Sequence, residues 1–204
     1  MNRLIIGTRG SKLSLLQTKG VVSMLLDAHP HLDIQIKTIQ TQGDDNVDKP
    51  VHDIGGKAVF TSALEDVLLE HNIDLAIHSL KDLPSTLSDH LIYVGSPRRE
   101  DVRDVFVSTK WNSIDDIPEG GTIATGSIRR KAQLLRQRTD LNIIGLRGNI
   151  DTRLRKLEKS TWDGMITAAA AMHRMALEER VSQYLKPEYF VPAGGQGAIG
   201  LETI

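Results

Sequence analysis

The chain has 204 residues, of which 40% are hydrophobic and 25% charged, a balance typical of a globular protein with one large domain or two small ones. No apolar run reaches the roughly 18 residues of a membrane-spanning helix. Residues 1–9 lack the apolar region of a signal peptide. The absence of cysteine excludes disulfides, thiolate metal sites and a cysteine nucleophile. We therefore expect a cytoplasmic protein.

The net charge is only −1, but the charges are unevenly distributed along the chain. Residues 123–157 hold nine arginines and lysines against two aspartates, so this segment carries +7 and the remainder −8. Such segregation indicates either a local anionic partner or a solvated basic face. Composition alone leaves both open.

Runs with strand-like composition alternate with segments of helical periodicity along the whole chain. The first half predicts strands at 4–6, 34–39 and 74–77, with helices at 13–28 and 60–68. The second half predicts strands at 105–107, 122–124, 142–146 and 165–167, with helices at 128–138, 150–159 and 168–175. This alternation indicates an α/β fold with mostly parallel sheets. The polar, proline-bearing stretch 96–101 marks the boundary between two lobes, and we expect a cleft between them.

Two predicted strand-to-helix junctions combine arginine with small residues. They are Thr8-Arg9-Gly10-Ser11 and Thr125-Gly126-Ser127-Ile128-Arg129-Arg130. Unpaired backbone N–H groups at a helix start attract carboxylates or phosphates, although Ser11 can equally be a plain helix cap. In the second junction two adjacent cations oppose the helix dipole. A bound anion would offset that conflict, so we predict an anion site there.

Further candidate residues follow the later strands. Arg147, in Leu146-Arg147-Gly148-Asn149, and Arg153, early in the next helix, could share one rim or be ordinary surface arginines. The stretch His78-Ser79-Leu80-Lys81-Asp82-Leu83-Pro84 ends a strand, where ligands gather in open α/β sheets. Its Lys81 and Asp82 are either a surface ion pair worth about 0–1 kcal/mol or a carboxylate aimed at a developing cation.

These motifs, taken in order, resemble the porphobilinogen deaminase (hydroxymethylbilane synthase) family over essentially the whole chain. No single stretch is decisive, but the ordered set is specific. The matching stretches are 8–11, 55–57, 74–84, 98–101, 126–130, 146–149 and 195–198.

The resemblance implies a fold of three domains, of which the first two resemble the lobes of periplasmic binding proteins around a hinged cleft. Domain 1 would comprise residues 1–97 and 191–204, and domain 2 residues 98–190. In the family, a cysteine of the third domain carries the covalent dipyrromethane cofactor, and this sequence has no cysteine. The chain is therefore expected to be a fragment, to work with a separate third-domain polypeptide, or to be inactive. We expect a monomer.

The resemblance also implies a chemistry and a set of site residues. Four porphobilinogen molecules lose ammonia and join into a linear tetrapyrrole in haem biosynthesis, and each unit adds an acetate and a propionate. Asp82 matches the catalytic aspartate, and Lys57 matches a lysine on a loop that covers the site. The positions that match binders of cofactor or substrate carboxylates are Arg9, Ser11, Lys81, Ser127, Arg129, Arg130, Arg147, Arg153 and Arg174.

The sequence departs from the family pattern at three places. Ala58 replaces a glycine after Lys57, and Ser62 replaces a lysine just beyond it. Residues 171–174 read Ala-Met-His-Arg where Gly-Leu-Lys-Arg is usual, although the arginine is retained. These changes leave the effect of the covering loop open.

Two other classes of function compete with a transferase. A two-lobed module that binds small anions without chemistry has no use for an acid among its arginines, which counts against it. Nucleic-acid binding is disfavoured by an aromatic content of only 4% and by arginines at turns rather than in a stripe. The seven histidines show no metal-ligand spacing, so we expect no metal and no nucleic acid.

Overall fold

The structure is a computed structural model that describes residues 3–41 and 61–204. Its contacts divide the chain into two compact units: unit 1 is Met1–Arg99 with Ala198–Ile204, and unit 2 is Glu100–Gly197. Each unit contains one sheet covered by helices, so the predicted α/β class is confirmed. Within the described ranges, no helix is long and apolar enough to cross a membrane.

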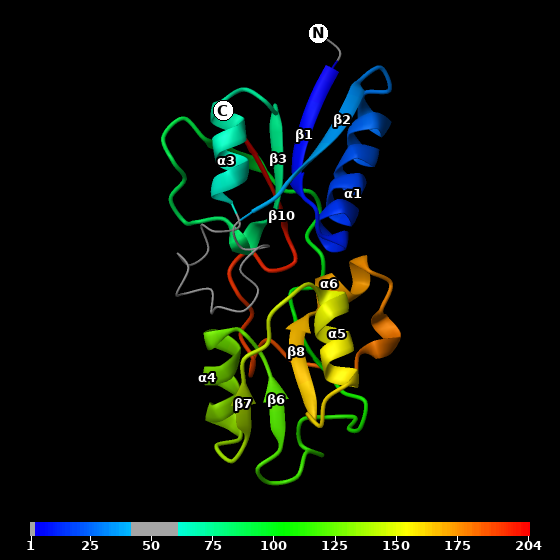
Figure 1. The fold of residues 1–204 in the computed structure, drawn as a ribbon, viewed down its shortest axis with the longest axis vertical. Helices are drawn as coiled ribbons and strands as arrows, with labels where there is room; N and C mark the ends of the chain where they lie inside the picture. The colour runs from blue at the N-terminus through cyan, green and yellow to red at the C-terminus, as the bar shows by residue number, and fades with distance from the viewer. Residues whose placement is uncertain (1–2, 42–60) are drawn as a thin grey trace. The chain divides into compact units, whose positions relative to one another are not determined.

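Unit 1 is built on a five-stranded sheet in the order β2-β1-β3-β10-β4. The strands are β1 (Arg3–Arg9), β2 (Asp33–Ile39), β3 (Leu75–Ser79), β4 (Ile92–Gly95) and β10 (Ile199–Thr203). The first three strands along the chain pair in parallel, and β10 runs antiparallel to both β3 and β4 (Figure 1). The carboxyl ends of β1 and β3 therefore lie at the same edge as the start of β10.

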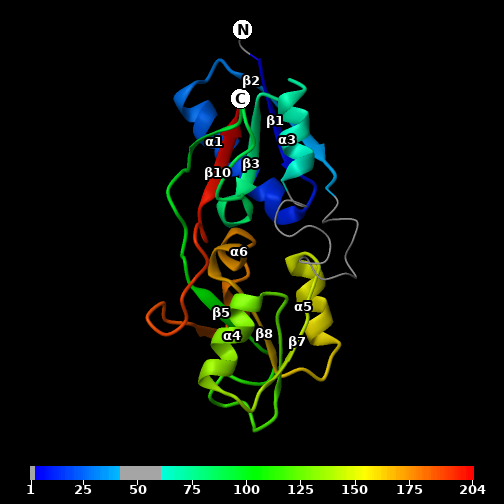
Figure 2. The ribbon, with the colours of Figure 1, turned by 90° about the vertical axis from the view of Figure 1, so that its left-hand side faces the viewer.

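The two helices of unit 1 cover opposite faces of this sheet. They are α1 (Lys12–Ala28) and α3 (Ser62–Leu69), and both views place the sheet between them (Figures 1 and 2). Val21 of α1 packs with Ile6 and Ile77, whereas Leu64 and Leu68 of α3 join a separate cluster. Burying two faces explains why β1 and β3 read as nearly continuous apolar runs.

Unit 2 repeats this arrangement with the sheet order β7-β6-β8-β5-β9. The strands are β5 (Asp104–Val107), β6 (Thr122–Ala124), β7 (Asn142–Ile144), β8 (Gly164–Ala168) and β9 (Gln183–Tyr184). Strands β6, β7 and β8 are parallel, and β5 is antiparallel to β8. The amino end of β5 consequently lies at the edge where the parallel strands finish.

The helices of unit 2 follow its parallel strands. They are α4 (Ile128–Gln137), α5 (Ile150–Glu158) and α6 (Ala169–Arg174). Figure 2 shows α4 and α5 on different sides of the strands. Fully buried Phe106 and Ile123 centre the core, and Leu134 of α4 packs into it.

Segment 191–197, which the sequence predicted for the first domain, belongs to unit 2 by its contacts. The Gln133 amide donates to the Val191 carbonyl at 3.0 Å, and the Val191 N–H donates back to the Gln133 side chain. The Gln196 amide donates to the carbonyl of Val102 at 2.8 Å. These polar ties fix the segment to α4 and to the start of β5, a pairing that no sequence pattern signals. The division into two domains stays a prediction.

We predict that Gly164→Ala destabilises unit 2. A Cβ at this buried position would lie 2.1 Å from Cε2 of Phe106, whose ring fills the core and cannot withdraw. Overpacking of this kind costs about 1–3 kcal/mol. Urea denaturation should show a lower midpoint. Gly194→Ala is the matched control, because nothing lies within 4 Å of the added Cβ, and an unchanged midpoint in both variants would contradict the prediction.

Candidate functional site

The predicted site residues of unit 1 lie at the carboxyl edge of its parallel strands. Arg9 is the last residue of β1, and Ser11 caps α1 directly afterwards. The Ser14 N–H donates to Ser11 Oγ at 3.2 Å, so the capping role that the sequence left open is present. Lys81 and Asp82 follow β3 at the same edge in the 3₁₀ turn Leu80–Asp82.

The turn that carries Asp82 is fixed from two sides. The Leu80 N–H donates to the Ala198 carbonyl at 3.0 Å, which ties the turn to the start of β10, and the Leu83 N–H closes it onto Leu80 at 3.2 Å. Asp82 itself is half-buried at the edge of the unit. A carboxylate on a short, tied turn keeps its position better than one on a free loop.

A buried polar pair lies in the sheet two residues before this turn begins. His78 Nε2 lies 3.0 Å from Oε2 of Glu202, with side-chain exposures of 3% and 0%. The pair joins β3 to β10 across the sheet, four residues before Asp82. Oε1 of Glu202 is buried without a hydrogen-bond partner, which is costly and therefore unusual.

The predicted site residues of unit 2 gather where its parallel strands end. Ser127 caps α4, with Oγ 3.4 Å from the Arg130 N–H, and Arg129 and Arg130 occupy the first turn. Arg147 follows β7. A Cβ on Gly126 would lie 2.6 Å from the Leu146 carbonyl, so glycine lets the turns after β6 and β7 approach each other.

A buried carboxylate that the sequence had not singled out organises these arginines. Asp104, fully buried at the start of β5, accepts a hydrogen bond from Arg129 NH2 at 2.7 Å. Arg130 donates to its other oxygen from Nε at 3.0 Å and NH2 at 2.7 Å. The Gln196 amide adds a fourth bond at 3.0 Å. One carboxylate thus joins β5, α4 and the 196 segment.

The Asp104 carboxylate offsets the unfavourable interaction between the dipole of α4 and the two adjacent arginines at its start. Burial raises the pKa of Asp104, but the charges of Arg130 and Arg129 and the hydrogen bonds from Arg130 and Gln196 outweigh it, so this pKa lies below its usual value. The anion beside the two helix-start cations is therefore the protein's own. Arg130 is only 6% exposed, whereas the Arg129 side chain keeps 27%.

The remaining arginines of the predicted set are partly engaged by backbone. Arg153 Nε donates to the Gly148 carbonyl at 2.6 Å, which folds the start of α5 back onto the turn that follows Arg147. Arg174, at the end of α6, donates to the Gly197 carbonyl at 2.7 Å. Burial lowers the pKa of Arg174, with the Glu100 charge acting in the opposite direction.

Two expectations concern the covering loop. Lys57 and Ala58 lie outside the described residues, and Ser62 is the first residue of α3.

Among the described residues, no group of three or more histidine, aspartate or glutamate side chains could hold a metal ion.

The donor set suits acidic groups, including carboxylates. Guanidinium groups and helix-start N–H groups lie at the strand ends of unit 2, and arginine binds carboxylates through paired hydrogen bonds. These groups fit the acid side chains of a dipyrromethane. The sequence contains no thiol for a thioether link, so non-covalent groups are all that this chain itself can offer.

Comparison with known proteins identifies the family. The model of "Porphobilinogen deaminase, dipyromethane cofactor binding domain" matches residues 4–204, and the chain belongs to this family. It is 46% identical to the porphobilinogen deaminase of Syntrophobacter fumaroxidans, over 97% of this chain and 64% of the relative. The Francisella tularensis enzyme is 45% identical over 100% of this chain and 68% of its own length. The chain thus spans about two thirds of its relatives' length.

Solved structures confirm the two-unit fold expected from the resemblance. The methionine binding protein MetQ matches with a TM-score of 0.57 at 15% identity, covering 99% of this chain and 83% of its own. A putative methionine-binding lipoprotein of Bacillus subtilis matches with a TM-score of 0.60 at 10% identity and the same coverage. At such identities the likeness shows the fold alone.

We predict that Asp104→Asn destabilises unit 2 by about 3–5 kcal/mol at neutral pH, because it leaves Arg129 and Arg130 without the anion that pairs them. Chemical denaturation measures the loss. Asp140→Asn breaks the Arg138–Asp140 pair, in which both side chains are partly exposed, and should cost much less. Equal losses in the two variants would contradict the structural role of Asp104.

The same variant has a defined pH dependence. Because the pKa of Asp104 is lowered on folding, its stabilisation is complete above the usual aspartate range and is lost as pH falls through the folded pKa. The stability difference between wild type and Asp104→Asn should therefore narrow in acid. A difference that stays constant from neutral to strongly acidic pH would contradict this assignment.

Proposed function

We propose that this chain supplies the catalytic and anion-binding part of a hydroxymethylbilane synthase, which joins four porphobilinogen molecules into a linear tetrapyrrole in haem biosynthesis. The observation that carries the proposal is that a carboxylate and several arginines stand at strand ends in a chain of this family. Strand ends are where open α/β sheets bind ligands. An acid among cations suits a reaction whose substrate is anionic and whose transition state is cationic.

Asp82 is the catalytic residue of the proposal. As ammonia leaves porphobilinogen, positive charge develops on the pyrrole, and the Asp82 carboxylate would stabilise it while accepting hydrogen bonds from pyrrole N–H groups. The bonds that tie Leu80 and Leu83 hold this carboxylate in place during the reaction. No reorganisation is then needed as the charge appears, which is the source of such electrostatic catalysis.

The cations would hold the acetates and propionates of substrate and growing chain. Arg9, Ser11 and Lys81 stand at the edge of unit 1, and Ser127, Arg129, Arg147, Arg153 and Arg174 belong to unit 2. Lys57 remains in the proposal by family resemblance. Arg130 is best assigned to positioning Arg129, because its guanidinium is buried against Asp104.

The proposed cofactor is a dipyrromethane, which supplies the first pyrroles of the chain. Its carboxylates would be held by the same arginines, and its covalent link would come from a cysteine outside this sequence. A third-domain polypeptide, joined or separate, is therefore a proposed partner. The monomeric state and the cytoplasmic compartment belong to the same proposal.

We predict that Asp82→Asn lowers turnover by about 10²–10³, equal to about 3–4 kcal/mol, because the amide keeps the size of the carboxylate and loses its charge. The measurement is steady-state kinetics on this chain fused to the C-terminal third of a relative. Porphobilinogen affinity should stay constant or rise, since a negative charge leaves an anion site. Arg129→Ala should lower affinity together with turnover. Wild-type turnover of Asp82→Asn would remove Asp82 from the chemistry.

We predict that porphobilinogen binding to this chain weakens as salt rises. Charge-assisted hydrogen bonds to arginine contribute about 1.5–3 kcal/mol each, and ions screen such charges where they meet water. Calorimetric titration at low and high sodium chloride measures the effect. Unsubstituted pyrrole, which lacks carboxylates, is the control ligand. Salt-independent binding of porphobilinogen would count against an arginine-lined site.

A further inference from the structure

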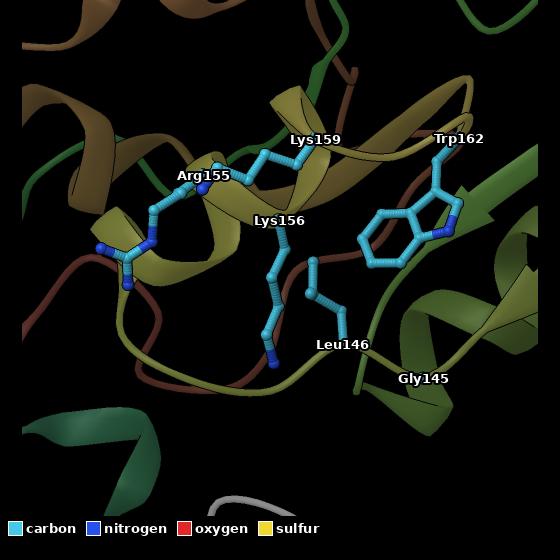
Figure 3. A pocket seen from close by; sticks show the side chains of 6 residues that line it. All are labelled: Gly145, Leu146, Arg155, Lys156, Lys159 and Trp162. Carbon is cyan, nitrogen blue, oxygen red and sulfur yellow. The ribbon is translucent and has the colours of Figure 1, made fainter.

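A hollow of about 430 Å³ opens in unit 2 beside the carboxyl end of α5. Figure 3 shows its lining: the backbone of Gly145, the buried Leu146, the indole of Trp162 and three cationic side chains of α5 and its end. The cations are Arg155, Lys156 and Lys159. None of these lining residues belongs to the set proposed above for Asp82 chemistry.

Helix capping does not account for the three cations. Cations near a helix carboxyl end often bind its last carbonyls. Here backbone and serine groups bond two of these carbonyls: the Lys159 N–H donates to the Arg155 carbonyl at 3.2 Å, and the Ser160 N–H and hydroxyl both donate to that of Leu157. The side chain of Lys156 reaches away from the helix end, to the Arg147 carbonyl at 3.3 Å.

Neighbouring acids do not neutralise the cations either. Glu158 accepts from Arg180 at 2.6 Å. Asp163, next to Trp162, accepts from the Trp111 indole at 2.9 Å and the Thr122 N–H at 2.8 Å. Across residues 3–41 and 61–204, no ion pair joins a carboxylate to Arg155, Lys156 or Lys159. Among the described residues, the groups around the hollow therefore carry an excess of positive charge.

The remaining walls are apolar and open. The half-buried Trp162 ring stands next to Leu146, and Figure 3 shows the stem of Lys156 running alongside both. A Cβ on Gly145 would meet nothing within 4 Å, so space remains in front of this backbone. An indole face beside cationic heads suits a flat aromatic ring that bears acid groups.

We propose that this hollow binds a pyrrole bearing carboxylates, with the ring against Trp162 and the acids on Lys156 and Lys159. The inference deepens the proposed function, on which it rests. Through Lys156, the hollow adjoins the turn that carries Arg147, one of the proposed carboxylate binders. It is thus an outer subsite for a chain that gains two carboxylates with every added pyrrole.

Tryptophan fluorescence tests the subsite directly, without turnover. The chain has two tryptophans, so Trp111→Phe leaves Trp162 as the only one. Titrating this variant with porphobilinogen should change its fluorescence saturably. Adding Lys156→Ala and Lys159→Ala should weaken the response about tenfold or more. Lys131→Ala with Lys186→Ala removes the same charge from exposed sites of unit 2 and is the matched control, expected to change nothing.

Inorganic phosphate is the charge-only probe. An equal fluorescence response to phosphate at the same concentration would overturn recognition of the aromatic ring. No response to porphobilinogen, or equal weakening by both lysine pairs, would overturn the subsite. Calorimetric titration of Arg129→Ala with porphobilinogen separates the two proposals. If Arg129→Ala weakens binding while the Lys156 and Lys159 changes do not, the subsite is wrong and the proposed function stands. If neither set of changes weakens binding, both fail.

Discussion

The Asp104 carboxylate holds together three parts of unit 2 that are far apart in the sequence. It is fully buried and accepts four hydrogen bonds, three from the adjacent arginines of α4 and one from Gln196. A charge removed from water in this way is tolerable only when it is paired and fully bonded. Every group around it is therefore held in one arrangement, and Arg129 gains a fixed orientation toward the edge of the sheet.

The sheet topology explains why the Asp104 carboxylate lies close to the amino end of a helix. In both units an antiparallel strand, β10 or β5, begins at the edge where the parallel strands end. Its first residues face the turns that lead into the helices. In unit 1 this strand ties the Asp82 turn through Ala198, and in unit 2 it brings Asp104 to Arg129. The same sheet order thus positions Asp82, the proposed catalytic acid, in one unit and the anchoring Asp104 in the other.

Local pattern predicted the elements but not these long-range polar ties. Strand β6 and helix α5 follow periodicity and composition closely, because each buries an apolar face. Strand β10 was missed, since Glu202 breaks its apolar pattern and is buried only through His78, 124 residues away. Asp104 was also missed, because its partners Arg129 and Gln196 lie far away in the sequence. A carboxylate directly before the buried run Val105-Phe106-Val107 could have indicated a buried, paired acid. The sequence predicted a bound anion at the start of α4; the carboxylate that the structure shows there is Asp104 of the protein itself, and the ligand site stays a prediction.

An arginine that is already paired is a different binding group from one that is free in water. Arg129 is paired with Asp104 and donates to the Val191 carbonyl. Its electrostatic attraction for an anionic ligand is therefore weaker than that of an unpaired arginine. What it retains is orientation, which lowers the entropy lost when a carboxylate docks. Arginines paired in this way bind anions less tightly than bare ones but hold them in a defined place. The proposed function calls for that combination, because tight binding of each carboxylate would stop a polyanion from advancing unit by unit, whereas a fixed orientation of Arg129 keeps the bound carboxylate in a defined place.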